Sequence, residues 1–209
     1  IFIIPNWSGL TKIKPVAKNE NPFINENKLQ DKFIVQYSGN IGYTHNVELL
    51  VEVAKMMKDY NDIIFLIIGR GDRVNHIKNM IQEYKLENCI QMPFQPDETL
   101  NFSLAAADLG VVILDEKTAH ASVPSKIYNL QAVGVPIVAI ASLDSEINEH
   151  IEKYENGKTY AQNDLDGVKN FILKCKDDKD YLKKISDNSI TASKDFSMDN
   201  ANKYYEYYV

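Results

Sequence analysis

The sequence is short of cysteine and of positive charge, and each shortage excludes a class of protein. Its 209 residues hold only two cysteines, too few for a disulfide framework or a cysteine-based zinc site. A formal net charge of −6 argues against a general nucleic-acid-binding surface, so any anion site must be local. No apolar run reaches the length that crosses a membrane. These shortages favour a cytoplasmic protein that binds neither nucleic acid nor a structural metal.

The chain is rich instead in alternating apolar and amphipathic segments. Compact apolar runs predict buried strands at 33–37, 63–68, 89–92, 109–114 and 136–140. Apolar residues spaced three and four apart predict helices at 44–60, 72–84, 98–107, 124–134, 145–152, 166–175, 181–193 and 198–208. This alternation is typical of an α/β fold, an open parallel sheet with helices on both faces and right-handed crossovers.

Composition separates the two ends of the chain from its middle. The sequence begins without Met on a short apolar segment, 1–4, which indicates a short strand and a piece of a longer protein. Residues 12–31 are polar and include two prolines, so we predict an irregular lead-in there. Beyond residue 141 the chain is less apolar, and we expect only helices with a turn at 156–157.

Most of the unusual residues gather in the loops that follow the predicted strands. In an open parallel sheet these loops meet at one edge, where ligands bind. They cover residues 39–44, 69–72, 93–97, 115–125 and 141–145. Their clustering predicts a binding site at that edge without naming its ligand.

The helix predicted at 124–134 carries the clearest chemical signal. Pro124 suits a first helical position, and Gly134 is a natural stop. Ser125 and Asn129 are four apart and share one helix face. Lys126 places an exposed cation in the first turn, at the positive end of the helix, which predicts an anion there, most simply a phosphate. The alternative is an ordinary amphipathic helix with a surface lysine.

Six segments occur in an order that identifies a family. They are IIPNW at 3–7, YSGNIGYTHN at 37–46, FLIIGRG at 65–71, MPFQP at 92–96, AAADLGVVIL at 105–114 and VPSKIYNLQAVGVPIVA at 123–139. Together they resemble the C-terminal, donor-binding half of a retaining glycosyltransferase with the GT-B fold, in family 4 (group 1). The PSK of the last segment is similar to the variant found in lipopolysaccharide and capsule enzymes.

The resemblance implies an organisation and an activity. Residues 1–32 would be the interdomain crossover and lead-in, and 33–195 the Rossmann-like domain that binds a nucleotide sugar. Residues 196–209 would form a tyrosine-rich helix that packs toward an N-terminal acceptor domain outside this sequence. The whole enzyme would transfer a hexose to a surface polysaccharide or glycolipid, in the cytoplasm or at the inner face of the membrane. It would use no metal or cofactor, with UDP-sugars favoured as donors, and this chain alone would be inactive.

The resemblance also implies roles for particular residues. Lys126 and His45 would stabilise the diphosphate leaving group. The donor would be bound by Gly39, Asn40, Gly42, Arg70, Met92, Phe94, Pro124, Ser125 and Asn129.

The chain departs from the family pattern at two places. Many members carry two glutamates eight positions apart, where this sequence has Ala121 and Asn129. The Asn129 amide can still bond ribose hydroxyls, and Glu116 is an alternative carboxylate from a loop of different length. Many members also have Arg and Lys after the first glycine, where this sequence has Asn40 and His45. With fewer cations there, Lys126 becomes more important for binding the diphosphate.

Three alternatives remain open from the residues. A nucleotide-sugar epimerase would need acid–base pairs of carboxylate and histidine, and this sequence shows no clear pair. A dehydrogenase-like nucleotide-binding module would need a G-x-G-x-x-G fingerprint after the first strand, which is absent. Two D-x-D triplets, 164–166 and 178–180, suggest a metal only if their carboxylates converge, and both lie in charged, surface-like segments.

Overall fold

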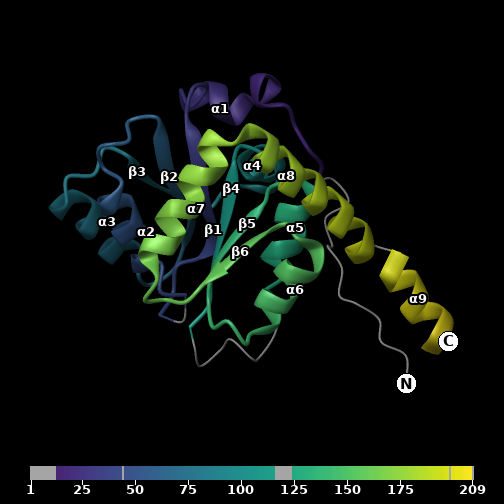
Figure 1. Cartoon of the computed structure of the whole chain (residues 1–209). Coiled ribbons are helices and arrows are strands. Elements are labelled where there is room, and N and C mark those ends of the chain that lie inside the picture. Colours follow the sequence, from purple (N-terminus) through teal and green to yellow (C-terminus); the bar gives the residue numbers. More distant parts are fainter. Residues whose placement is uncertain (1–12, 44, 116–123, 198, 209) are drawn as a thin grey trace.

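A six-stranded parallel sheet forms the centre of the computed structural model, which describes residues 13–43, 45–115, 124–197 and 199–208 (Figure 1). The strand order is β3-β2-β1-β4-β5-β6, and every neighbouring pair is parallel. The strands are β1 (Phe33–Asn40), β2 (Ile63–Arg70), β3 (Cys89–Met92), β4 (Leu109–Ile113), β5 (Ile137–Ile140) and β6 (Gly157–Tyr160). The predicted α/β fold with an open parallel sheet is therefore confirmed.

Helices cover both faces of this sheet (Figure 1). One face packs against α2 (Glu48–Met56), α3 (Val74–Glu83) and α7 (Leu165–Asp177). The other packs against α1 (Pro22–Glu26), α4 (Asp97–Leu104), α5 (Lys126–Ala132) and α6 (Glu146–Tyr154). The remaining helices are α8 (Lys179–Ser193), which packs along α5, the short 3-10 helices η1 (Lys18–Glu20) and η2 (Lys194–Phe196), and α9 (Asp199–Tyr208).

The central strands are buried on both faces, which explains their continuous apolar sequence. Residues 63–69 of β2 are all buried, and β1 pairs with β2 in register from Phe33 opposite Ile63 to Asn40 opposite Arg70. Apolar side chains at successive positions enter the two opposite halves of the core. These pairings place the carboxyl ends of β1, β2 and β4 side by side at one edge of the sheet.

The sixth strand corrects the prediction of a turn at 156–157. Residues 157–160 pair with β5, starting from Gly157 opposite Ile137. A Cβ at Gly157 would lie 1.8 Å from the Ile137 carbonyl oxygen, so this glycine permits a close approach of two strands rather than a turn. The strand was missed because it is short and polar. It also lies at the edge of the sheet, where it pairs with a single strand, β5.

The lead-in contains more structure than its polar composition predicts. Phe23 and Ile24 of α1 are buried against the sheet. The Lys18 ammonium lies 2.7 Å from an Asp108 carboxylate oxygen, which also accepts from the Ile34 N–H at 2.7 Å. Residues 18–32 are thus fastened to the strands, and the division of the chain at residue 32 stays a prediction. The predicted strand at 1–4 lies outside the described residues.

The first predicted helix is shorter than expected. It was predicted at 44–60, whereas α2 begins at Glu48 and ends at Met56. Asn46 has a φ of +41°, a left-handed conformation that cannot continue a right-handed helix. His45 therefore precedes α2 in a turn, and its N–H donates to the Gly42 carbonyl at 3.2 Å. Thr44, where the predicted helix was to begin, lies outside the described residues.

The last helix extends away from the body of the domain (Figure 1). On α9 the side chains of Tyr204, Tyr205 and Tyr207 are 53%, 66% and 53% exposed. That exposure is what the predicted interdomain role requires, and the partner surface itself stays a prediction. Among the described residues, no helix has both the length and the apolar character needed to cross a membrane.

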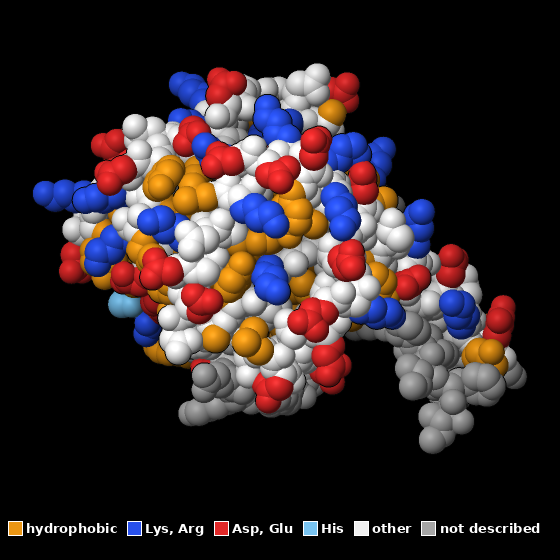
Figure 2. Space-filling view, viewed as in Figure 1, with side chains coloured by type: hydrophobic (Ala, Val, Ile, Leu, Met, Phe, Trp, Pro, Cys, Tyr) orange, Lys and Arg blue, Asp and Glu red, His pale blue; other side chains and the backbone are white. Residues whose placement is uncertain are grey.

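Charge on the outer surface is mixed rather than gathered. Figure 2 shows acidic and basic side chains interspersed over the face of the molecule that carries α7 and α8. Interspersed charges of opposite sign give no strong field of one sign, and salt screens exposed charges beyond about 10 Å at 0.1 M ionic strength. An anion site in this chain is therefore to be sought in a local cavity.

Candidate functional site

A cavity of about 170 Å³ lies where the carboxyl ends of β1 and β4 meet the start of α5. Its lining brings together five of the residues predicted from the sequence, which are Gly39, Phe94, Ser125, Lys126 and Asn129. They come from three segments far apart in the chain, which are the end of β1, the loop after β3 and the start of α5. The parallel sheet collects them because all three segments lie at its carboxyl edge.

Lys126 is the most unusual group in this cavity. Although the residue as a whole is partly exposed, its ammonium nitrogen is covered and has no hydrogen-bond acceptor among the described residues. The nitrogen lies 4.2 Å from the centroid of the Tyr37 ring. Burial lowers the pKa of Lys126 from 10.5 to about 8, because leaving water disfavours the charged form. The expectation of an exposed lysine is thus wrong, and a buried charge of this kind calls for an anionic partner.

The start of α5 differs slightly from the prediction. The helix begins at Lys126 with Ser125 as its N-cap, so Pro124 precedes the helix instead of opening it. At the other end Gly134 has a φ of +76° and ends the helix as predicted. The Gly134 carbonyl accepts from the Ser186 hydroxyl of α8 at 2.6 Å, which fixes α5 from behind the site.

The loop from Gly39 to Tyr43, here called the glycine loop, is shaped by backbone bonds to the next strand. The Ile41 N–H donates to the Arg70 carbonyl at 2.8 Å, and the Ile41 carbonyl accepts from the Arg73 N–H at 3.0 Å. At Gly39, with a φ of +153°, a Cβ would lie 3.0 Å from the Lys126 ammonium nitrogen. A side chain at Gly39 would crowd the lysine, and the positive φ independently favours glycine.

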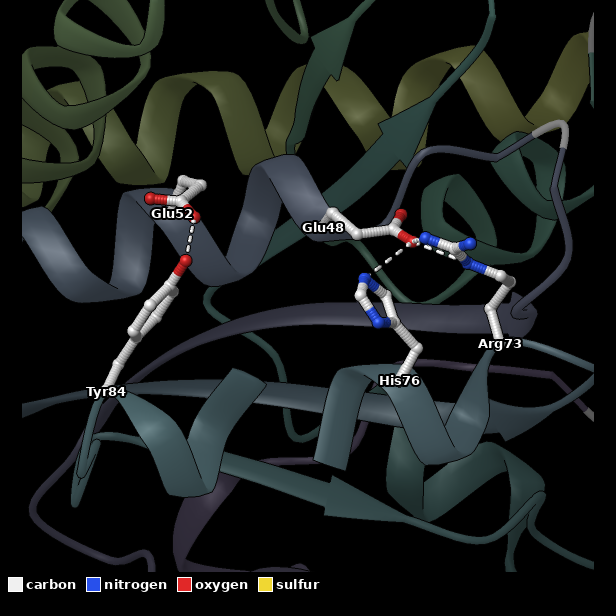
Figure 3. Close-up of polar contacts among 5 residues, drawn as sticks. All are labelled: Glu48, Glu52, Arg73, His76 and Tyr84. Carbon is white, nitrogen blue, oxygen red and sulfur yellow. Dashed lines mark hydrogen bonds and ion pairs between the residues drawn. The ribbon is translucent and has the colours of Figure 1, made fainter. Parts of the chain in front are cut away.

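A polar network between α2 and α3 supports the glycine loop from outside (Figure 3). The Arg73 guanidinium donates to the Glu48 carboxylate, and its central carbon lies 5.2 Å from the centroid of the Tyr43 ring. His76 approaches the same carboxylate at 3.7 Å. Further along, the Tyr84 hydroxyl donates to Glu52 at 2.8 Å. The contacts of Arg73 with Glu48 and with Tyr43 hold the segment between β1 and α2 against α3.

His45 lies within electrostatic reach of Lys126. Its pKa is lowered, first by burial and then by the positive charge of Lys126. Its imidazole is therefore neutral near pH 7 and keeps one N–H as a donor. The structure places His45 before α2, and not inside the helix that was predicted at 44–60.

The other predicted donor-binding residues occupy two different places. Arg70 lies at the rim, with its guanidinium carbon 5.1 Å from the Phe94 ring centroid. The Asn40 side chain lies over Gly42 and Gly71. Met92 instead lines a separate cavity of about 450 Å³ between α1 and α4, because it precedes the loop that carries Phe94 into the site. Glu116 and Ala121 lie outside the described residues.

Tyr37 belongs to the site and was missed as a functional residue. It is fully buried at the end of the apolar run of β1, so sequence pattern marks it as core. Its hydroxyl donates to the Asn40 carbonyl at 2.6 Å. The one available signal is the phenol hydroxyl of Tyr37, which closes the predicted apolar run 33–37 two residues before Gly39.

The D-x-D triplets have local structural roles. The Asp164 side chain accepts from the Gly167 N–H and caps α7, and the Asp178 side chain accepts from the Tyr181 N–H and caps α8. Within 13–43, 45–115, 124–197 and 199–208, no three His, Cys, Asp or Glu residues are grouped so that they could hold a metal ion. The two triplets are thus explained by helix capping.

Comparisons with known proteins agree with this geometry. The family model described as glycosyl transferases group 1 matches residues 18–192. The putative colanic acid biosynthesis glycosyl transferase WcaI of Escherichia coli is 31% identical over 74% of this chain and 38% of its own length. The probable glycosyltransferase WbjE of Pseudomonas aeruginosa is 29% identical over 78% of this chain and 41% of its own. None of these matches supports the epimerase alternative.

Solved structures show the same fold. Anabaena HepE, solved in complex with UDP and glucose, superposes with a TM-score of 0.82 at 18% identity, over 97% of this chain and 55% of that one. The chain thus has the Rossmann-like fold of one half of a GT-B glycosyltransferase. It spans about two-fifths of the length of the two relatives named above. With the family model matching most of its residues, the chain belongs to the glycosyl transferases group 1 family.

Proposed function

We propose that this chain is the donor-binding half of a retaining glycosyltransferase and that it binds a nucleotide-diphosphate sugar, with UDP favoured as the nucleotide. The observation that carries this proposal is the buried Lys126 ammonium, which faces a cavity and lacks an acceptor among the described residues. A diphosphate would supply that acceptor. The complex of HepE with UDP and glucose and the polysaccharide role in the name of WcaI support the same conclusion.

The chemistry follows from where charge develops. Sugar transfer breaks the bond between the anomeric carbon and the diphosphate, and the leaving oxygen gains negative charge. A positioned ammonium stabilises that charge more in the transition state than in the ground state, which lowers the barrier. Lys126 would do this, helped by the His45 N–H and by backbone N–H groups of the glycine loop. Pro124 and Ser125 would shape the entry to the helix beside the phosphates.

The nucleoside would lie farther along the same edge. Asn129 lines the cavity one helical turn beyond Lys126, and its amide can bond the ribose hydroxyls. Phe94, with Arg70 over it, would form a wall for the base. Met92 would act only through the backbone of its loop, given the separate cavity that its side chain lines.

The acceptor side would come from the rest of a longer protein. Both relatives are more than twice as long as the segment matched, and the tyrosines of α9 are exposed. The proposal therefore includes a cytoplasmic enzyme whose second domain holds the acceptor, a surface polysaccharide or glycolipid. The isolated chain is expected to bind donor without transferring sugar.

Calorimetric titration of this chain tests the proposal. UDP is expected to bind at least tenfold more tightly than uridine, with UMP between them, because most of the affinity comes from the diphosphate. Adding EDTA and then Mg²⁺ is expected to leave UDP affinity unchanged. A strict metal requirement, equal affinity for uridine and UDP, or preference for NAD would overturn the proposal.

A further inference from the structure

We propose that Tyr37 is a positioning residue of the donor site, whose ring holds the Lys126 ammonium while its hydroxyl holds the glycine loop. The inference rests on the proposed function, because it concerns how the diphosphate site is built. Tyr37 is fully buried in β1, three residues before the strand ends. Its hydroxyl bond to the Asn40 carbonyl measures 2.6 Å, and its ring centroid lies 4.2 Å from the lysine nitrogen. One side chain thus contacts both parts of the site.

The ring explains why Lys126 can be buried at all. Without an acceptor among the described residues, the ammonium would lose its hydration and gain nothing in return. The negative face of an aromatic ring attracts a cation, and the attraction grows when water is excluded. The Tyr37 ring therefore keeps the lysine folded toward Gly39 and ready for an anion, and it limits the fall of the lysine pKa that burial causes.

The hydroxyl acts on the other side of the site. A carbonyl oxygen that faced the cavity would repel a phosphate. Because the buried phenol donates to the Asn40 carbonyl, that oxygen is turned toward the core at the middle of the glycine loop. Burial raises the Tyr37 pKa well above its usual value, so the phenol keeps the proton that this bond needs across the working pH range.

The two contacts can be separated by substitution. Tyr37→Phe keeps the ring and removes the hydroxyl, whereas Tyr37→Leu removes both. Tyr84→Phe is the matched control, since it removes a tyrosine hydroxyl bond of similar length, 2.8 Å to Glu52, between the end of α3 and the middle of α2 (Figure 3). Each variant is titrated with UDP and with uridine, and the Lys126 side chain is titrated with pH by NMR in the free protein.

We expect Tyr37→Phe to weaken UDP binding about 3- to 10-fold and Tyr37→Leu about 30-fold or more, with uridine affinity unchanged in both. The apparent pKa of Lys126 should stay near about 8 in Tyr37→Phe and fall in Tyr37→Leu. Tyr84→Phe should match the wild type in every measurement. Thermal melts and amide spectra establish that each variant is folded, and Tyr37→Phe tests the hydroxyl even if Tyr37→Leu does not fold.

Two outcomes would overturn the inference. One is wild-type UDP affinity in Tyr37→Phe and Tyr37→Leu, and the other is an equal loss for UDP and uridine, which is the mark of a merely structural residue. Failure of the wild type to bind UDP would count against the proposed function instead. In that case the NMR titration still decides whether Tyr37 positions Lys126, since a lysine pKa equal in all variants would rule this out.

Discussion

Replacing Lys126 with methionine is expected to weaken UDP binding about ten- to a hundredfold and, at the same time, to stabilise the folded domain. Methionine keeps the length and apolar stem of the side chain but removes the charge. Hydrogen bonds to charged groups contribute roughly 1.5–3 kcal/mol, which sets the expected loss of affinity. Uridine, which lacks phosphates, should bind both proteins equally, and calorimetry with the two ligands separates these effects.

The stability half of this prediction follows from the buried charge. In the wild type the folded state bears the cost of covering the ammonium, partly offset by the Tyr37 ring, so Lys126→Met should raise the free energy of unfolding by about 1–3 kcal/mol at pH 7. The lysine pKa falls from 10.5 unfolded to about 8 folded. Below pH 8 Lys126 is protonated in both the folded and the unfolded state, so the folded state bears the full free-energy cost of the buried charge. Between pH 8 and 10.5 only the unfolded state binds the proton, so wild-type stability rises with pH and the advantage of the variant disappears.

Lys179→Met is the matched control, because Lys179 is also the first residue of a helix, α8, but is exposed. It should change neither UDP affinity nor stability by more than about 0.5 kcal/mol. The account of Lys126 is contradicted if Lys126→Met binds UDP like the wild type. It is equally contradicted if that variant is less stable than the wild type at pH 7.

Replacing Gly69 with alanine is expected to be the most destabilising small substitution at the site edge, by about 3 kcal/mol or more. A Cβ there would lie 2.0 Å from the Gly39 carbonyl oxygen, which is far inside any real contact. Backbone on both sides must move, because Gly39 and Gly69 are paired in the β1–β2 ladder. Since Gly39 also borders Lys126, the variant should bind UDP more weakly even under conditions where it folds.

Gly42→Ala provides the comparison for Gly69→Ala. Its Cβ would first meet the end of the Asn40 side chain, at 3.0 Å, and that group can rotate away. Urea unfolding should therefore show a change below about 1 kcal/mol for Gly42→Ala and a much larger one for Gly69→Ala. Similar midpoints for the two variants would show that the close β1–β2 approach is not needed for the fold.

The open parallel sheet, and the gathering of the glycine-bearing segments at one edge of it, were predictable because they depend on local composition. Residues 63–69 of β2 are apolar because they are covered on both faces, and glycines at the ends of β1 and β2 mark the edge where a site was predicted. Such patterns could not reveal β6, whose four residues are polar and owe their conformation to pairing with β5. Nor could they show that Asn46 would adopt a left-handed conformation and shorten the helix after it.

The burial of Lys126 could not be predicted for a different reason. A lysine in a first helical turn is ordinarily solvated, and only the three-dimensional fold brings its nitrogen over the Tyr37 ring and against Gly39. Likewise, Met92 and Phe94 are close in sequence but line different cavities, because a strand ends between them. Contacts between distant segments decide both cases, and a local pattern does not record them.

A crystal structure of this chain grown with UDP is the most direct test of the central claim, that the buried lysine is the diphosphate site. The account predicts a phosphate oxygen about 2.7–2.9 Å from the Lys126 nitrogen, the usual length of a charge-assisted bond, with the ribose beside Asn129. A UDP molecule bound with its diphosphate elsewhere, and Lys126 still covered and unchanged, would contradict it.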